Sequence, residues 1–282
     1  MIRAPLAIPS LLFLSGVAVV RGETPKVAIG YCAQLREIDA VRAAGFDYVE
    51  LRTSEVAGLS DAEFEALAEG LRRDGPPVPV TYLFIPGSIK VTGPAVDEEQ
   101  QRSYLRKALA RVARLGAETV VFGSGPARQV PEGFPKKEAF EQLVGFCKRL
   151  APEARSRNLV IAIEPQRREE CNIVNTVAEG LELVRAVDDP SIQLTVDFYH
   201  LAMEKEDPAI VVAAASHVRH LHMANPEGRV FPLDWKEYAY APFFESLRKI
   251  GYRGRMSVEA RAQDFPGEAP RTIAFLRSAF VR

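Results

Sequence analysis

Four side chains that can bind a cation stand at the ends of short apolar runs in the second half of the sequence. They are Glu164, Asp197, His222 and Glu259, and each directly follows a run rich in β-branched residues. Two glutamates, one aspartate and one histidine form an oxygen-rich ligand set, which suits Mn²⁺, Mg²⁺ or Co²⁺ better than a structural zinc. The sequence therefore predicts one divalent metal ion bound by these residues, with ion pairing to nearby arginines as the alternative.

The spacing of the four residues indicates the fold that would bring them together. They lie 33, 25 and 37 positions apart, about one strand–helix unit of a (β/α)8 barrel, whose active sites gather at the carboxyl ends of the strands. Short apolar runs alternate with longer amphipathic segments from residue 26 onward, which is typical of a parallel sheet. The runs predict strands at Val27–Tyr31, Tyr48–Leu51, Val80–Phe84, Thr119–Phe122, Val160–Ile163, Gln193–Val196, Val218–Leu221 and Arg255–Val258. We therefore predict an α/β fold, a single-domain (β/α)8 TIM barrel over residues 25–282.

Several residues mark the ends of the predicted helices and the loops between elements. Gly45, Gly116 and Gly251 each follow a basic helical segment, and Asn158 takes the same place at a fourth junction. These residue types tolerate the left-handed conformation that ends a helix. Long connections follow the third, fourth and seventh strands, over residues 85–97, 123–135 and 225–241, and we expect these loops to border the site.

Composition excludes several classes of partner. The chain has 36 Lys and Arg against 37 Asp and Glu, so its net charge of -1 gives no broad attraction for nucleic acid or an anionic membrane. Three widely spaced cysteines argue against a disulfide scaffold or a zinc ribbon. Residues 1–24 are apolar and interrupted by prolines, which is typical of a leader, either a signal peptide or a disordered segment, and not of a stable membrane span. The protein is exported if residues 1–22 are a signal peptide, and cytoplasmic otherwise.

Two further features are interpreted as structural. His220 shares a strand face with His222 but lies one layer deeper, so we expect a buried structural histidine. The segment Gly123-Ser124-Gly125-Pro126 could present backbone amides to an anion, but it lacks the lysine and helix of a phosphate-binding loop. A plain turn is the favoured interpretation.

Beyond their spacing, the residues around the predicted ligands resemble a known family. The sequence resembles the xylose isomerase-like barrel superfamily, in the sugar isomerase and epimerase branch that includes tagatose and psicose 3-epimerases and hydroxypyruvate isomerase. The motifs that carry the resemblance are Ile163-Glu164-Pro165, Arg168, Glu170, Asn175-Thr176, Asp197-Phe198-Tyr199-His200, His220-Leu221-His222 and Ser257-Val258-Glu259.

The resemblance implies roles for individual residues. Glu164 and Glu259 would bind the metal ion and also act as the acid–base pair on opposite faces of the substrate. His200 and Glu170 match substrate-binding residues of the branch, although Glu169 could replace its neighbour, and Arg229 is the nearest candidate for a substrate-binding arginine. A metal ion that bridges the carbonyl and hydroxyl oxygens would stabilise an enediolate while one carboxylate removes a proton and the other returns it.

The predicted function is therefore a divalent-metal-dependent isomerase or epimerase of a sugar or sugar phosphate, with Mn²⁺ as the expected ion. Two alternatives remain open, a metal-dependent dehydratase of the inosose type and a non-catalytic sugar-binding barrel. The resemblance also implies a homo-oligomer. An endonuclease of the same superfamily is disfavoured because its three-zinc centre needs more histidines than the four in this chain.

Overall fold

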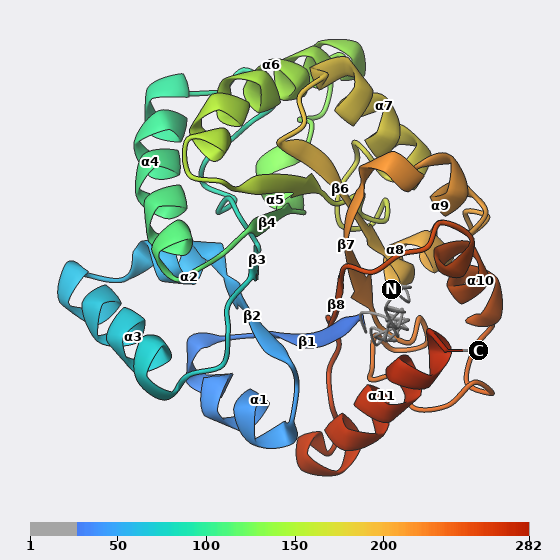
Figure 1. The fold of residues 1–282 in the computed structure, drawn as a ribbon. Coiled ribbons are helices and arrows are strands. Elements are labelled where there is room, and N and C mark those ends of the chain that lie inside the picture. Colours follow the sequence, from blue (N-terminus) through green and yellow to red (C-terminus); the bar gives the residue numbers. More distant parts are fainter. Residues whose placement is uncertain (1–26, 282) are drawn as a thin grey trace, which may run out of the picture.

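Eight parallel strands form a closed barrel in the computed structural model, which describes residues 27–281. The strands follow one another around the barrel in chain order, and β8 pairs with β1 to close it. Figure 1 shows the barrel from one end, with the helices in a ring outside it. The strands are β1 (Ala28–Ala33), β2 (Tyr48–Arg52), β3 (Val80–Tyr82), β4 (Thr119–Phe122), β5 (Val160–Ile163), β6 (Ile192–Asp197), β7 (Val218–Met223) and β8 (Arg255–Val258). The predicted (β/α)8 fold is confirmed.

Helices connect the strands and cover the outside of the barrel. They are α1 (Ile38–Ala44), α2 (Thr53–Gly58), α3 (Asp61–Asp74), α4 (Glu98–Arg114), α5 (Gly125–Arg128), α6 (Lys136–Arg155), α7 (Val177–Val187), α8 (Phe198–Met203), α9 (Ile210–Ala213), α10 (Ala241–Lys249) and α11 (Phe265–Ala279). Two 3-10 turns, η1 (Leu35–Glu37) and η2 (Ala215–His217), complete the set. Between helices and sheet lies the main apolar core, where side chains such as Leu109, Phe146 and Leu276 are fully or almost fully buried.

Local sequence explains where the helices begin and end. Ser60 and Glu63 form a capping box that begins α3, because each side chain binds the backbone N–H of the other residue. The four junction residues Gly45, Gly116, Gly251 and Asn158 all have positive φ, between 57° and 91°. The predicted helix ends are therefore confirmed, since glycine and asparagine adopt this conformation at low cost.

Strand boundaries differ from the prediction at several points. β3 ends at Tyr82, two residues early, because Leu83 turns into the left-handed region with φ of 47°. β6 includes Asp197 and β7 continues past His222 to Met223, since Asp197 pairs with His222 across the two strands. These two predicted ligands therefore lie within the sheet, while the two glutamates follow their strands as predicted.

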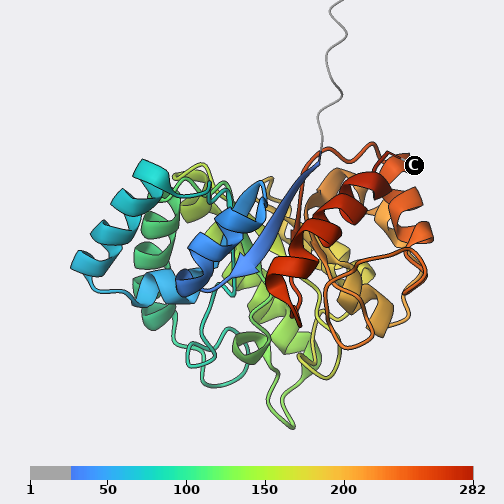
Figure 2. The same ribbon diagram turned by 90° about the horizontal axis from the view of Figure 1, so that it is seen from below.

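The two ends of the barrel differ in construction. Figure 2 shows the barrel from the side, with β1 pointing toward the edge from which the long loops project. The connection over residues 85–97 has no helix or strand, whereas the connection over 123–135 contains α5.

Among residues 27–281, no helix combines the length and the apolarity needed to cross a bilayer. The predicted leader at residues 1–24 lies outside the described residues.

Candidate metal centre

The structure brings the four predicted ligands together at the carboxyl end of the barrel. They come from four consecutive positions around it: Glu164 after β5, Asp197 at the end of β6, His222 in β7 and Glu259 after β8. One ligand atom from each lies within 4.8 Å of those of the other three. Because the carboxyl ends of parallel strands meet at one end of a barrel, positions far apart in sequence become neighbours.

The geometry of this cluster fits a divalent cation. His222 Nδ1 lies 2.7 Å from Glu164 Oε1 and 3.3 Å from Glu259 Oε2. Asp197 Oδ1 accepts the Tyr199 backbone N–H at 2.7 Å, while the buried Oδ2 atom has no hydrogen-bond partner. The Arg229 guanidinium approaches this oxygen only to 3.7 Å. A buried carboxylate oxygen without a hydrogen bond beside two other carboxylates is unfavourable, and a cation in their midst would remove that cost. The donor set, three carboxylates and one imidazole, is one that Mn²⁺ and similar ions accept.

Electrostatics in the cluster reflect crowded negative charge. Burial raises the pKa of Asp197 to about 7, and the carboxylates of Glu164 and Glu259 add to that effect against the opposing Arg229. Burial likewise raises the pKa of Glu164. For Glu259, burial is outweighed by Arg229 and His222, which hold its pKa at about 2. Burial and mutual repulsion therefore disfavour the ionised forms of Asp197 and Glu164, and a cation within the cluster would favour them.

Arg229 reaches the centre from the loop after β7. Its Nη2 atom donates to Glu259 Oε2 at 2.7 Å, and Nη1 lies 3.3 Å from Glu170 Oε1. The guanidinium also stacks over the Tyr199 ring, 4.5 Å from its centroid. Arg229 has φ of 52°, a conformation uncommon for a residue with a side chain. The structure thus places the predicted arginine at the site, between two of the other predicted residues.

His200 and Glu170 border the same space. His200 Nδ1 accepts the backbone N–H of Arg167 at 3.2 Å, which assigns the ring proton to Nε2. That Nε2 atom is buried without a hydrogen-bond partner and lies 3.6 Å from Asp197 Oδ2. Burial, followed by the charge of Arg229, lowers the pKa of His200 to about 3, so the ring is neutral. His200 therefore directs an unused N–H donor toward the centre.

The choice between Glu169 and Glu170 is settled by exposure and contacts. The Glu169 side chain is 68% exposed and only approaches Arg167, at 3.8 Å. The Glu170 side chain is 30% exposed, bonds to Arg167 and Arg229, and lines the pocket above the four ligands. Glu170 is thus the carboxylate that faces the site.

One buried acid was not singled out by the sequence analysis. Glu50 of β2 is fully buried, and its Oε1 and Oε2 atoms lie 3.0 and 2.9 Å from the Nε2 atoms of His222 and His220. Its signal in the sequence is a carboxylate in the middle of the apolar run Tyr48–Leu51. His220 is 1% exposed, as expected for a buried structural histidine.

The glycines after β4 make room for the site. A Cβ atom on Gly123 would lie 2.2 Å from Glu164 Oε2, and one on Gly125 would lie 2.6 Å from Gln166 Oε1. The Ser124 hydroxyl is already engaged, because it accepts the Ile85 backbone N–H at 2.9 Å. This segment is a turn into α5 that gives clearance to neighbouring side chains, in agreement with the favoured interpretation.

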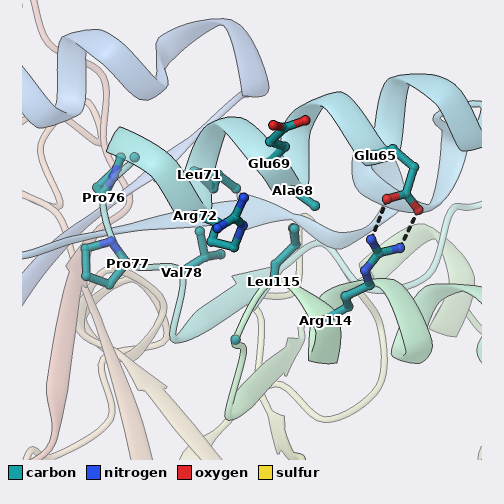
Figure 3. Close-up of a pocket in the computed structure, with 12 residues that line it drawn as sticks. Glu65, Ala68, Glu69, Leu71, Arg72, Pro76, Pro77, Val78, Arg114 and Leu115 are labelled. Carbon is teal, nitrogen blue, oxygen red and sulfur yellow. Dashed lines mark hydrogen bonds and ion pairs between the residues drawn. The ribbon is translucent and has the colours of Figure 1, made fainter.

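A pocket of about 1030 Å³ opens above the cluster. Its polar walls include Arg52, Tyr82, Arg167, Glu170, Tyr199, Arg229 and Glu259. A smaller hollow of about 620 Å³ lies at the amino ends of β3 and β4, beside α3 and the end of α4 (Figure 3). There Arg114 is paired with Glu65. Two clusters among the described residues could bind a metal ion, and no residue of either cluster lines this smaller hollow. Of these two pockets, the larger one therefore adjoins the candidate metal centre, because Glu259 lines it.

Comparison with known proteins agrees with this geometry. Residues 38–279 match the family model described as xylose isomerase-like TIM barrel. The chain belongs to this family. A probable ketose 3-epimerase of Synechocystis is 26% identical over 229 residues, covering 77% of this chain and 74% of the relative. An L-ribulose 3-epimerase of Mesorhizobium japonicum is 24% identical over 238 residues, covering 83% and 77%.

Solved structures support the fold of this family member. A crystal structure of D-psicose 3-epimerase in the presence of D-fructose superposes with a TM-score of 0.80 at 18% identity. The alignment covers 90% of this chain and 99% of that one. The curated relatives are epimerases, which form a subclass of isomerases, and the predicted enzyme class agrees with them.

Proposed function

We propose that this family member is a divalent-metal-dependent epimerase of a ketose or ketose phosphate. The observation that carries the proposal is the convergence of Glu164, Asp197, His222 and Glu259, with Asp197 Oδ2 lacking a hydrogen bond and Glu259 lining the pocket. The names of the relatives favour 3-epimerisation over aldose–ketose isomerisation. They also favour an enzyme over a sugar-binding barrel or a dehydratase.

Epimerisation beside a carbonyl requires removal and return of a proton on carbon. Such a proton is too weakly acidic for an isolated carboxylate, and a bound divalent ion supplies charge stabilisation to the enediolate oxygens. In this proposal Glu164 and Glu259 exchange protons with the substrate. They reach the centre from β5 and β8, with β6 and β7 between them, so they approach a bound sugar from different sides.

The neighbouring residues are suited to hold the sugar. His200 presents its free Nε2–H donor, and Glu170 presents carboxylate oxygens that can accept from a hydroxyl. Arg229 draws Glu259 and Glu170 together, which fixes both carboxylates relative to each other. Hydrogen bonds of this kind orient the substrate so that its reacting carbon faces the acid–base pair.

The test is proton exchange in D₂O with a panel of ketoses and ketose phosphates, after loading the protein with Mn²⁺, Mg²⁺ or Co²⁺. We expect about one metal ion per chain and deuterium incorporation at carbon 3 with inversion there. Deuterium at carbon 1 with formation of an aldose would instead indicate aldose–ketose isomerisation. Loss of water from the sugar would indicate the dehydratase, and metal-free protein without exchange would refute the proposal.

A further inference from the structure

A chain of buried polar side chains continues from the metal centre into the barrel. Glu50 lies between His222 and His220, at 3.0 and 2.9 Å from their Nε2 atoms. Ser257 donates its hydroxyl to Glu50 Oε2 at 2.5 Å, and the Tyr48 hydroxyl lies 2.7 Å from Ser257 Oγ. All five residues are at most 2% exposed. We call these five residues the buried network.

Counting donors and acceptors fixes where the protons lie in the buried network. A carboxylate only accepts, so its three partners, the Nε2 atoms of His222 and His220 and the Ser257 hydroxyl, must all donate to it. Because Ser257 gives its proton to Glu50, the Tyr48 hydroxyl donates to Ser257 Oγ. These three donors engage both oxygens of Glu50, and hydrogen bonds of this kind favour the ionised carboxyl group.

This arrangement determines which nitrogen of His222 can serve the metal. The Nε2 atom is engaged with Glu50, so Nδ1 is the ring nitrogen that can offer a lone pair to a metal ion. Nδ1 is the atom that faces Glu164 and Glu259, at 2.7 and 3.3 Å. A histidine that ligates a metal commonly donates its other N–H to a carboxylate, which fixes the ring and strengthens it as a ligand.

We propose that Glu50 is a positioning residue that holds His222 with Nδ1 directed at the metal ion and thereby sets the affinity of the centre. The inference rests on the metal-dependent function proposed above. Glu50 does not line the pocket, and its link to the four-ligand cluster is the contact with His222, so it acts through that residue.

A second metal site at the same place is the competing explanation. Cys32 Sγ lies 3.8 Å from His222 Nε2. Cys32, His222 and Glu50 form a second cluster, in which one ligand atom from each lies within 4.8 Å of the other two. However, both Glu50 oxygens already accept hydrogen bonds, and none of these three side chains has a buried polar atom without a partner. The buried network is therefore complete without a second ion.

The first experiment is titration calorimetry of purified full-length protein with Mn²⁺, comparing wild type, Glu50→Gln and Ser257→Ala. Glu50→Gln keeps the shape but replaces one acceptor oxygen by an amide donor, and we expect affinity for Mn²⁺ to fall about 10- to 100-fold. Ser257→Ala is the matched control, because it removes one donor to Glu50 Oε2 and leaves the contact between Glu50 Oε1 and His222 Nε2 in place. We expect a change of about threefold or less for the control.

The second experiment needs no variant and is independent of activity. Long-range ¹H–¹⁵N NMR spectra of the Mg²⁺-loaded protein resolve the tautomers of its four histidines. We expect the spin system of His222 to show a protonated Nε2 and an unprotonated Nδ1. The same spectra remain informative if Glu50→Gln does not fold.

The outcomes separate this inference from the proposed function. Wild-type protein that binds no Mn²⁺ would refute the metal centre and the inference with it. One ion per chain with unchanged affinity in Glu50→Gln would refute only the role of Glu50. Two ions per chain, or Nε2 of His222 as the unprotonated atom, would overturn the assignment in favour of the second site.

Discussion

Replacement of Gly123 by alanine should disable the metal centre while leaving the barrel folded. The added Cβ atom would lie 2.2 Å from Glu164 Oε2 and 2.8 Å from Gln166 Nε2. Because real Cβ contacts under 3.0 Å are essentially never observed, the Glu164 oxygen must retreat by at least 0.8 Å. The atoms in conflict are the ends of side chains and not backbone, so the side chains can yield without unfolding the protein.

The expected magnitude follows from that displacement. A catalytic group moved by about 1 Å commonly costs about 100-fold in rate, equivalent to about 2.7 kcal/mol in the activation barrier. Overpacking at a site that can relax lowers the free energy of unfolding by about 1 kcal/mol. We therefore expect Gly123→Ala to lose about 100-fold in proton exchange, and to bind Mn²⁺ more weakly, with a thermal midpoint only a few degrees below wild type.

The assay combines Mn²⁺ titration, deuterium exchange from D₂O and thermal unfolding on the same preparation. Gly70→Ala is the matched control, because no atom lies within 4 Å of its added Cβ and the residue is inside α3, far from the site. It should retain wild-type exchange and gain about 1 kcal/mol in the free energy of unfolding. A Gly123→Ala protein with both metal affinity and exchange rate within about twofold of wild type would refute the reasoning.

Four further predictions follow from the same structure. Glu259→Gln should abolish proton exchange while circular dichroism shows an intact fold, and near wild-type exchange would contradict its role. Asp197→Ala should lose bound metal by elemental analysis, and full metal content would contradict its role. Adding Mn²⁺ at about 100 times its dissociation constant should stabilise metal-free protein by about 2.7 kcal/mol, raising the thermal midpoint by about 5–10 °C, whereas an unchanged midpoint would argue against binding. Ser60→Ala should cost about 1 kcal/mol of stability at the start of α3 without affecting exchange, and a loss of exchange would show that α3 is coupled to the site.

The sequence by itself determined the fold and grouped the four predicted metal ligands. Eight apolar runs with glycine or asparagine at the helix ends predict the strand–helix repeat, because these patterns act locally on the backbone. Barrel topology explains why four residues could be grouped from the sequence alone, namely Glu164, Asp197, His222 and Glu259. In a closed parallel barrel every carboxyl strand end lies at the same rim, so position along a strand implies proximity in space.

Only the tertiary structure decided which other residues join them. In the sequence, Glu50 is one residue of the strand β2 with no sign of a partner. Its contact with His222 depends on barrel closure and strand register, neither of which a local pattern encodes. Arg229 reaches Glu259 because its backbone adopts a positive φ within an irregular loop. Gly123 matters because the Glu164 side chain, which follows the next strand, occupies the space that a Cβ atom at position 123 would need. These contacts depend on distances between segments far apart in the chain, which folding sets and the local sequence does not.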